Sequence, residues 1–145
     1  MPPAPPGAYR FRMNTMQNQL FDLTGKVAVV TGGASGIAQA IALGFAGQGA
    51  DVAVADINDV GVAETCAQIT ALGRKAMPAH CDISKPEQVA DLFAKVDETF
   101  GRVDILLNAP YIGAKKKPED LALEDWNRVM AVCLTGYFLC SQAAG

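Results

Sequence analysis

The sequence has 145 residues, of which 50% are hydrophobic and 19% charged, and its formal net charge is −3. These values are typical of one folded domain and exclude a disordered or fibrous chain. No apolar stretch reaches the ~18 residues of a membrane helix, and two acidic residues follow the only basic run, at residues 115–117, so we expect neither membrane nor nucleic-acid binding.

Residues 1–20 differ in composition from the rest of the chain, because four of the first six are proline, which lacks an amide donor. We predict a flexible leader there, without the apolar core of a secretory signal, followed by a domain over residues 21–145. Two alternatives stay open. The leader's two arginines fit a transit peptide, and translation starting at Met13 or Met16 would leave the leader out.

The first predicted strand is a continuous apolar run at residues 26–31, typical of a strand buried on both faces. A glycine-rich turn follows it. Ile37, Ile41 and Phe45 then recur every four residues, which predicts the apolar face of a helix that two later glycines end.

The second predicted strand, at residues 51–56, leads into a predicted helix over residues 59–72. A third strand is predicted at residues 75–81. Pro78 removes a backbone donor from this strand and favours a place at the edge of the sheet.

The next helix is predicted to begin near Ser84, whose hydroxyl can cap it while Glu87 reciprocates, with a proline in the first turn. Five apolar residues form its predicted stripe, which Gly101 ends: Val89, Leu92, Phe93, Val96 and Phe100. A fourth strand is predicted at residues 103–108, and a last helix from about Leu123 to the final residue.

Strands that alternate with helices predict an α/β fold with a parallel sheet covered by helices on both faces. Right-handed crossovers give the strand order 3-2-1-4 of a Rossmann-type, doubly wound sheet, here truncated before the later strands.

The four cysteines show no paired spacing, and His80 is the single histidine, so no metal site is expected. Reduced thiols predict a cytoplasmic protein. The cysteines are Cys66, Cys81, Cys133 and Cys140.

The turn at residues 31–38 predicts a dinucleotide site, because it joins a buried strand to the N-terminus of a helix, where free amides can bind a pyrophosphate. Asp56 lies 20 residues past Gly36, at the end of the second strand, where a carboxylate can bind both ribose hydroxyls of NAD. The same carboxylate would repel the 2′-phosphate of NADP, and no Arg or Lys stands nearby to accept that phosphate. NAD is therefore favoured over NADP.

These residues resemble the short-chain dehydrogenase/reductase family, whose fingerprint matches residues 31–38 except that Ala38 replaces a glycine. Residues 81–84, 101–106 and 126–136 resemble further segments of the family, and residues 21–26 resemble its sugar and polyol dehydrogenases. The resemblance implies hydride transfer between NAD and an alcohol or ketone substrate, in a homo-oligomer.

Carried over residue by residue, the resemblance implies a set of cofactor-binding positions. By this resemblance, Asp82 holds the amino group of the adenine, and a neighbouring residue packs on the adenine ring. The set is Gly32, Ser35, Gly36, Ile37, Asp56, Ile57, Cys81, Asp82, Ile83, Asn108, Ala109 and Val132.

The sequence departs from the family at two supporting positions. Ala109 replaces an asparagine beneath the nicotinamide, and Cys133 replaces an asparagine that supports a proton relay, for which a thiol is a poor hydrogen-bonding group. Tyr111 and Lys115 match the spacing of the family's catalytic pair. They follow a strand directly and have a glycine between them, so we interpret this match as a loop coincidence.

The family's catalytic Ser, Tyr and Lys lie on elements later than those recognised here. We therefore expect the cofactor-binding half of an NAD-dependent dehydrogenase. The alternative is a natural short product that binds NAD or a partner subunit without catalysis. An uncovered fourth strand and an apolar last helix, with Trp126, Met130 and Tyr137, also predict self-association or marginal stability.

Overall fold

The computed structural model describes residues 20–145, so the predicted leader at residues 1–20 lies outside it except for Leu20. Four parallel strands form one sheet in the order β3-β2-β1-β4, which confirms the predicted fold class and strand order. The strands are β1 (Val27–Thr31), β2 (Asp51–Asp56), β3 (Ala76–His80) and β4 (Ile105–Asn108).

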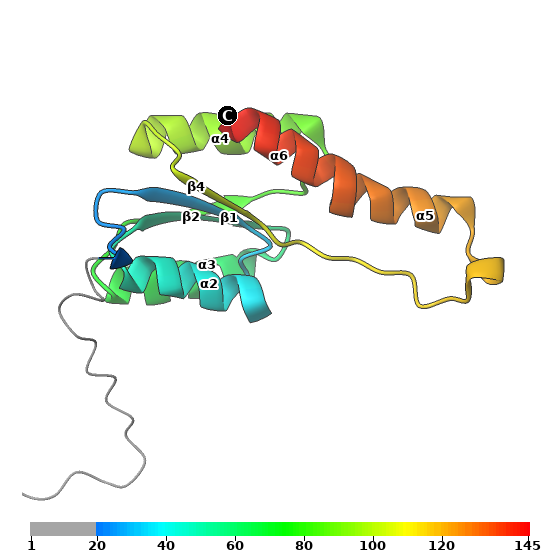
Figure 1. Cartoon of the computed structure of the whole chain (residues 1–145), viewed down its shortest axis with the longest axis horizontal. Helices are drawn as coiled ribbons and strands as arrows, with labels where there is room; N and C mark the ends of the chain where they lie inside the picture. Colours follow the sequence, from blue (N-terminus) through cyan, green and yellow to red (C-terminus); the bar gives the residue numbers. More distant parts are fainter. Residues whose placement is uncertain (1–19) are drawn as a thin grey trace, which may run out of the picture.

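Helices cover both faces of the sheet (Figure 1). Helices α2 (Gly36–Gly47) and α3 (Asp59–Ala71) lie on one face, and α4 (Pro86–Phe100) and α6 (Tyr137–Ala144) lie on the other. The side chains of β1 alternate between the two cores, with Val29 facing α4 and α6 and Val30 facing α2 and α3.

The predicted apolar face of α2 coincides only in part with the face that packs on the sheet, since Phe45 packs against the core as a partly buried side chain. Ile37 is 80% exposed, and the buried residues of α2 are three alanines, Ala38, Ala42 and Ala46. Small side chains let the helix backbone lie close to the sheet. The larger isoleucine, one position away, reaches the rim of a pocket.

Helix α4 begins where predicted but without the predicted cap. Lys85 is the N-cap residue and makes no capping bond with its side chain. The hydroxyl of Ser84 donates instead to Asp82 Oδ1 at 2.7 Å, and Gln88 Oε1 accepts from the Asp82 amide at 2.8 Å. Asp82 therefore organises the entry to α4, because its carboxylate also accepts from the Ser84 amide.

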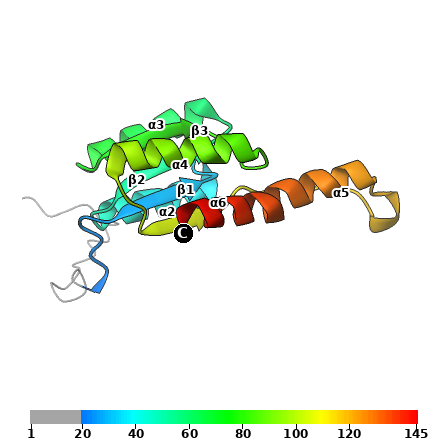
Figure 2. The same ribbon diagram turned by 90° about the horizontal axis from the view of Figure 1, so that it is seen from above.

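The last helical segment runs to Ala144 as α5 (Leu123–Met130), a wide π turn (Ala131–Gly136) and α6. A short 3₁₀ turn (Pro118–Asp120) precedes it. Helix α5 projects away from the sheet (Figure 2). Four large apolar side chains along the segment are exposed: Leu123, Trp126, Leu134 and Phe138. No helix in residues 20–145 is both long and apolar enough to cross a membrane.

Asp104 joins the starts of β1 and β4. Its Oδ2 accepts from the Val27 amide at 2.9 Å and from Arg102 Nε at 2.8 Å, and its Oδ1 accepts from Lys26 Nζ at 3.3 Å. The Arg102 guanidinium, together with the Val27 amide and the Lys26 ammonium, lowers the pKa of Asp104 from 3.8 to about 2.

This lowered pKa predicts a specific acid sensitivity. The stabilisation by Asp104 is complete above its unfolded pKa and is lost as the pH falls from about 4 to about 2. Melting temperatures measured across this range should therefore fall more steeply for the wild type than for Asp104→Asn. Parallel curves for the two proteins would show that the carboxylate contributes nothing through its charge.

Candidate functional site

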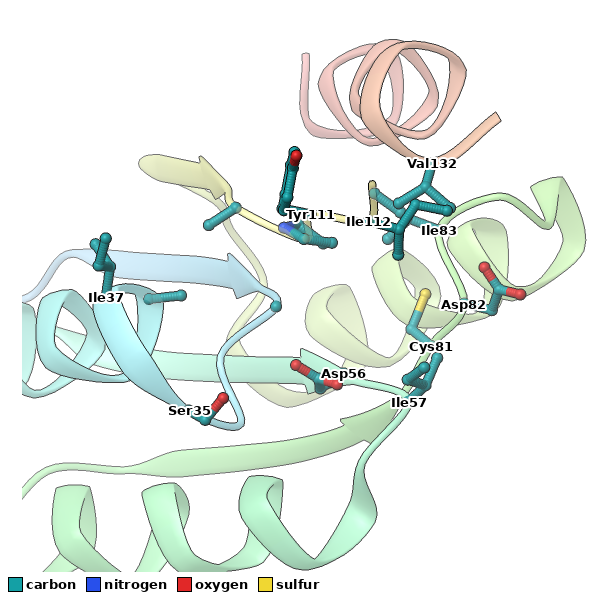
Figure 3. A pocket seen from close by; sticks show the side chains of 14 residues that line it. Ser35, Ile37, Asp56, Ile57, Cys81, Asp82, Ile83, Tyr111, Ile112 and Val132 are labelled. Carbon is teal, nitrogen blue, oxygen red and sulfur yellow. The ribbon is translucent and has the colours of Figure 1, made fainter. Parts of the chain in front are cut away.

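A pocket of about 480 Å³ lies where the carboxyl ends of the strands meet (Figure 3). Its walls come from the turn after β1, the ends of β2 and β3, the loop after β4 and the π turn. The lining residues are Gly32, Ser35, Ile37, Ala38, Asp56, Ile57, Cys81, Asp82, Ile83, Ala109, Pro110, Tyr111, Ile112 and Val132. Ligands of parallel α/β sheets bind at this edge.

The turn after β1 requires glycine at position 32. Gly32 has a φ of +75°, and a Cβ there would lie 2.7 Å from the Pro110 nitrogen. Its amide donates to the Ala55 carbonyl at 2.8 Å, which holds the turn against β2. At Gly32 the turn thus lies directly against backbone atoms of Ala109 and Pro110 in the loop after β4.

Helix α2 opens from this turn with its first amides available to a ligand. Ser35 is the N-cap residue, and its side chain makes no capping hydrogen bond. The first amides of a helix lack partners within the helix and carry a partial positive charge. Since Ser35 and Ile37 line the pocket, this end of α2 can bind an anion there.

The Asp56 carboxylate lies between the turn and the rest of the pocket wall. Its Oδ2 accepts from the Ala34 amide at 3.2 Å, and its Oδ1 accepts from the Asn58 amide at 3.0 Å. Figure 3 shows it between Ser35 and Ile57. None of the described side chains that line the pocket is basic, so Asp56 and Asp82 make its polar wall acidic.

Residues 81–83 continue the wall beyond β3. The Cys81 amide donates to the Asp56 carbonyl at 3.0 Å, which joins this segment to β2. Burial raises the pKa of the Cys81 thiol to about 12, with smaller contributions from nearby Cys140 and Asp82. The thiol is therefore neutral at physiological pH and acts as an apolar part of the wall.

Asn108, one of the predicted cofactor residues, does not line the pocket. Its Nδ2 lies 3.3 Å from Ser141 Oγ and 3.4 Å from the Tyr137 carbonyl, and its Oδ1 accepts from Thr31 Oγ1 at 3.3 Å. The side chain thus ties β1 and β4 to α6. Gly36, the other predicted residue outside the lining, is the first residue of α2.

The remaining ten predicted residues all line the pocket, and four further lining residues were not predicted: Ala38, Pro110, Tyr111 and Ile112. The last three follow Ala109 in the loop after β4. Tyr137 Oη donates to the Pro110 carbonyl at 2.8 Å and so holds this loop against the last helical segment. Pro110, Tyr111 and Ile112 could have been predicted from their position in a loop at the carboxyl end of a strand.

The structure also places the two residues with the spacing of the family's catalytic pair and the cysteine that replaces an asparagine of the family. Tyr111 and Lys115 lie on an irregular loop, as predicted, and not on a helix. Cys133, in the π turn, places its Sγ 3.6 Å from the Ile112 carbonyl. Val132, its neighbour, contributes to the pocket wall near Ile83 (Figure 3).

Comparisons with known proteins agree with this geometry. The family model described as short chain dehydrogenase matches residues 26–145. The chain is similar to a D-threitol dehydrogenase from Mycolicibacterium smegmatis, with 39% identity over 125 residues that cover 86% of this chain and 48% of that protein.

Two solved structures are also similar. One is the crystal structure of a short-chain type dehydrogenase/reductase from Mycobacterium marinum, with a TM-score of 0.84, 36% identity, and coverage of 87% of this chain and 51% of that chain. The other is an NAD⁺-bound xylitol dehydrogenase, with a TM-score of 0.81, 31% identity, and coverage of 84% and 47%. The chain thus spans about half the length of these relatives.

Proposed function

Because the chain belongs to the short-chain dehydrogenase family, we propose that residues 20–145 form the NAD-binding half of an oxidoreductase acting on an alcohol or ketone. The observation that carries this proposal is the Asp56 carboxylate, which lines the pocket beside the free N-terminus of α2. The amides at the N-terminus of α2 can bind a pyrophosphate, and the adjacent Asp56 carboxylate can bind the hydroxyls of a ribose.

The residues present fit the cofactor. The amides at the start of α2 would bind the pyrophosphate, and Asp56 would accept hydrogen bonds from the two ribose hydroxyls. Asp82 and Ile83 would hold the adenine, and Val132 and Ala109 would continue the site towards the nicotinamide. Gly32 allows the close backbone approach that this site needs, because a Cβ there would meet Pro110. Bound NAD would supply the acceptor or donor of a hydride.

The charge of the wall supports NAD over NADP. A 2′-phosphate would be placed against the Asp56 carboxylate, and none of the described lining residues is a lysine or arginine that could neutralise it. The NAD⁺-bound state named for the similar xylitol dehydrogenase agrees with this choice.

We extend the proposal to the complete enzyme by analogy with relatives named for polyol substrates. Its substrate is a small alcohol or ketone, and its form is a homo-oligomer. The pocket wall described here contains no lysine, and its one tyrosine, Tyr111, is on an irregular loop. We therefore propose that residues 1–145 alone do not turn over substrate.

Four free cysteine thiols support a cytoplasmic location.

Calorimetric titration of the 145-residue chain with NAD and with NADP tests the proposal. We expect saturable binding of NAD and at least about tenfold weaker binding of NADP, which corresponds to about 1.4 kcal/mol. Tighter binding of NADP would overturn the assignment of Asp56. No binding of either nucleotide would overturn the proposed function itself.

A further inference from the structure

One peptide unit of the glycine-rich turn, between Gly33 and Ala34, is held at both of its ends. On the pocket side, the Ala34 amide donates to Asp56 Oδ2 at 3.2 Å. On the opposite side, the Gly33 carbonyl oxygen lies 3.0 Å from the hydroxyl oxygen of Thr65. The plane of this peptide is therefore set by two side chains, of which only Asp56 lines the pocket.

Thr65 is a fully buried polar residue in the middle of α3, with 0% of its surface exposed. Its hydroxyl oxygen accepts from Gln39 Nε2 at 2.9 Å. Its single proton is shared between two acceptors, the Gly33 carbonyl oxygen and the Gly61 carbonyl oxygen, which lies 2.9 Å from the hydroxyl oxygen. A buried hydroxyl with all of its hydrogen-bonding capacity used joins α2, α3 and the turn at one point.

Helix α3 approaches the turn closely enough for this bond because residue 61 is glycine. A Cβ on Gly61 would lie 2.5 Å from the Ala34 carbonyl oxygen. The Asn58 side chain accepts from the Gly61 amide at 3.2 Å and fixes the start of α3 at this place. Helix α3 therefore contacts the glycine-rich turn through Gly61 and Thr65, on the side away from the pocket.

We propose that Thr65 is a positioning residue for dinucleotide binding. By holding the Gly33 carbonyl away from the pocket, it keeps the following amides turned towards the pyrophosphate of the bound cofactor. Rotation of this peptide would turn a carbonyl oxygen, which repels phosphate, towards the ligand and would break the bond from Ala34 to Asp56. This inference rests on the proposed function, since it assumes that the pocket binds a dinucleotide.

Thr65→Val removes the hydroxyl while keeping the shape of the side chain. Loss of the hydrogen bond to the Gly33 carbonyl predicts about tenfold weaker binding of NAD and of ADP-ribose, and Thr65→Ser should restore most of the affinity. Adenosine has no pyrophosphate and would sense only the lost bond from Ala34 to Asp56, so its binding should weaken less than that of NAD. A general loosening of the protein would weaken all three ligands together and would overturn the proposal.

Thr70→Val is the matched control, because Thr70 lies on the same helix and makes the same type of local bond, to the Cys66 carbonyl at 2.9 Å. Thr70 is exposed, and its hydroxyl bonds within α3 and not to the turn. This variant should bind NAD as the wild type does. Equal binding by both valine variants and the wild type would overturn the role of Thr65.

Hydrogen exchange without nucleotide separates this inference from the proposed function. The Ala34 amide should exchange faster in Thr65→Val than in the wild type or Thr70→Val, because its peptide is no longer held at both ends. Unchanged exchange at Ala34 would overturn the inference even if NAD binds. Failure of the wild type to bind NAD would overturn the proposed function, whatever the exchange rates.

Discussion

Replacing Gly32 with alanine is expected to lower the free energy of unfolding by roughly 2–4 kcal/mol and to abolish measurable NAD binding. Alanine disfavours the φ of +75° found at this position, and its Cβ would lie 2.7 Å from the Pro110 nitrogen. The atoms that this Cβ would contact belong to the backbone of Ala109 and Pro110. They cannot move aside as a flexible side chain could. Urea denaturation followed by circular dichroism measures the loss of stability.

Gly25→Ala separates the two causes. Gly25 has a similar φ of +78°, but no atom lies within 4 Å of a Cβ built there. This variant should lose only about 1–2 kcal/mol, the usual penalty of a left-handed backbone for alanine, and should keep its affinity for NAD. Equal destabilisation of the two variants would show that the approach of Pro110 to the turn does not restrict residue 32.

Replacing Asp56 is expected to change the choice of cofactor. Asp56→Ala should weaken NAD binding by roughly thirtyfold, or about 2 kcal/mol, because a charged acceptor of ribose hydroxyls is lost. Asp56→Asn keeps the shape of the side chain but removes its charge. It should shift the ratio of NADP to NAD affinity roughly tenfold towards NADP, since the repulsion of the 2′-phosphate is gone.

Asp59→Asn is the control for a general effect of charge. Asp59 lies three residues further on, pairs with His80 at 2.9 Å, and does not line the pocket. It should leave the ratio of affinities for the two nucleotides unchanged. An unchanged ratio in Asp56→Asn as well would mean that the Asp56 carboxylate does not face the adenosine ribose.

The fold could be predicted from the sequence because the two central strands, β1 and β2, are continuous apolar runs set apart by glycine or polar residues. The bounds of β2 agree with the prediction at both ends. The packed face of α2 was predicted only in part: Phe45 packs against the core, but the buried residues are Ala38, Ala42 and Ala46, which repeat with the same spacing. A prediction from hydrophobicity selects the larger side chains as the buried face of the helix. Close packing of the helix on the sheet instead favours small side chains on that face.

The candidate site was predictable where backbone geometry defines it and less so where tertiary contacts do. Ten of the proposed cofactor residues gather in one pocket: nine lie at or shortly after the carboxyl ends of neighbouring strands, and Val132 comes from the π turn. Asn108 is the last residue of β4, but bonds to Ser141 and the Tyr137 carbonyl draw its side chain towards α6. The π turn was not predicted, because one widened turn leaves the apolar period of a long helix almost unchanged.

Hydrogen–deuterium exchange of the 145-residue chain, measured with and without saturating NAD, tests most directly the claim that this pocket is the cofactor site. We expect slower exchange at the amides of Ser35, Gly36 and Ile37, which would bond to the pyrophosphate, and no change along α5, which projects away from the sheet. Protection confined to α5, or no protection at the start of α2, would contradict the assignment of the pocket.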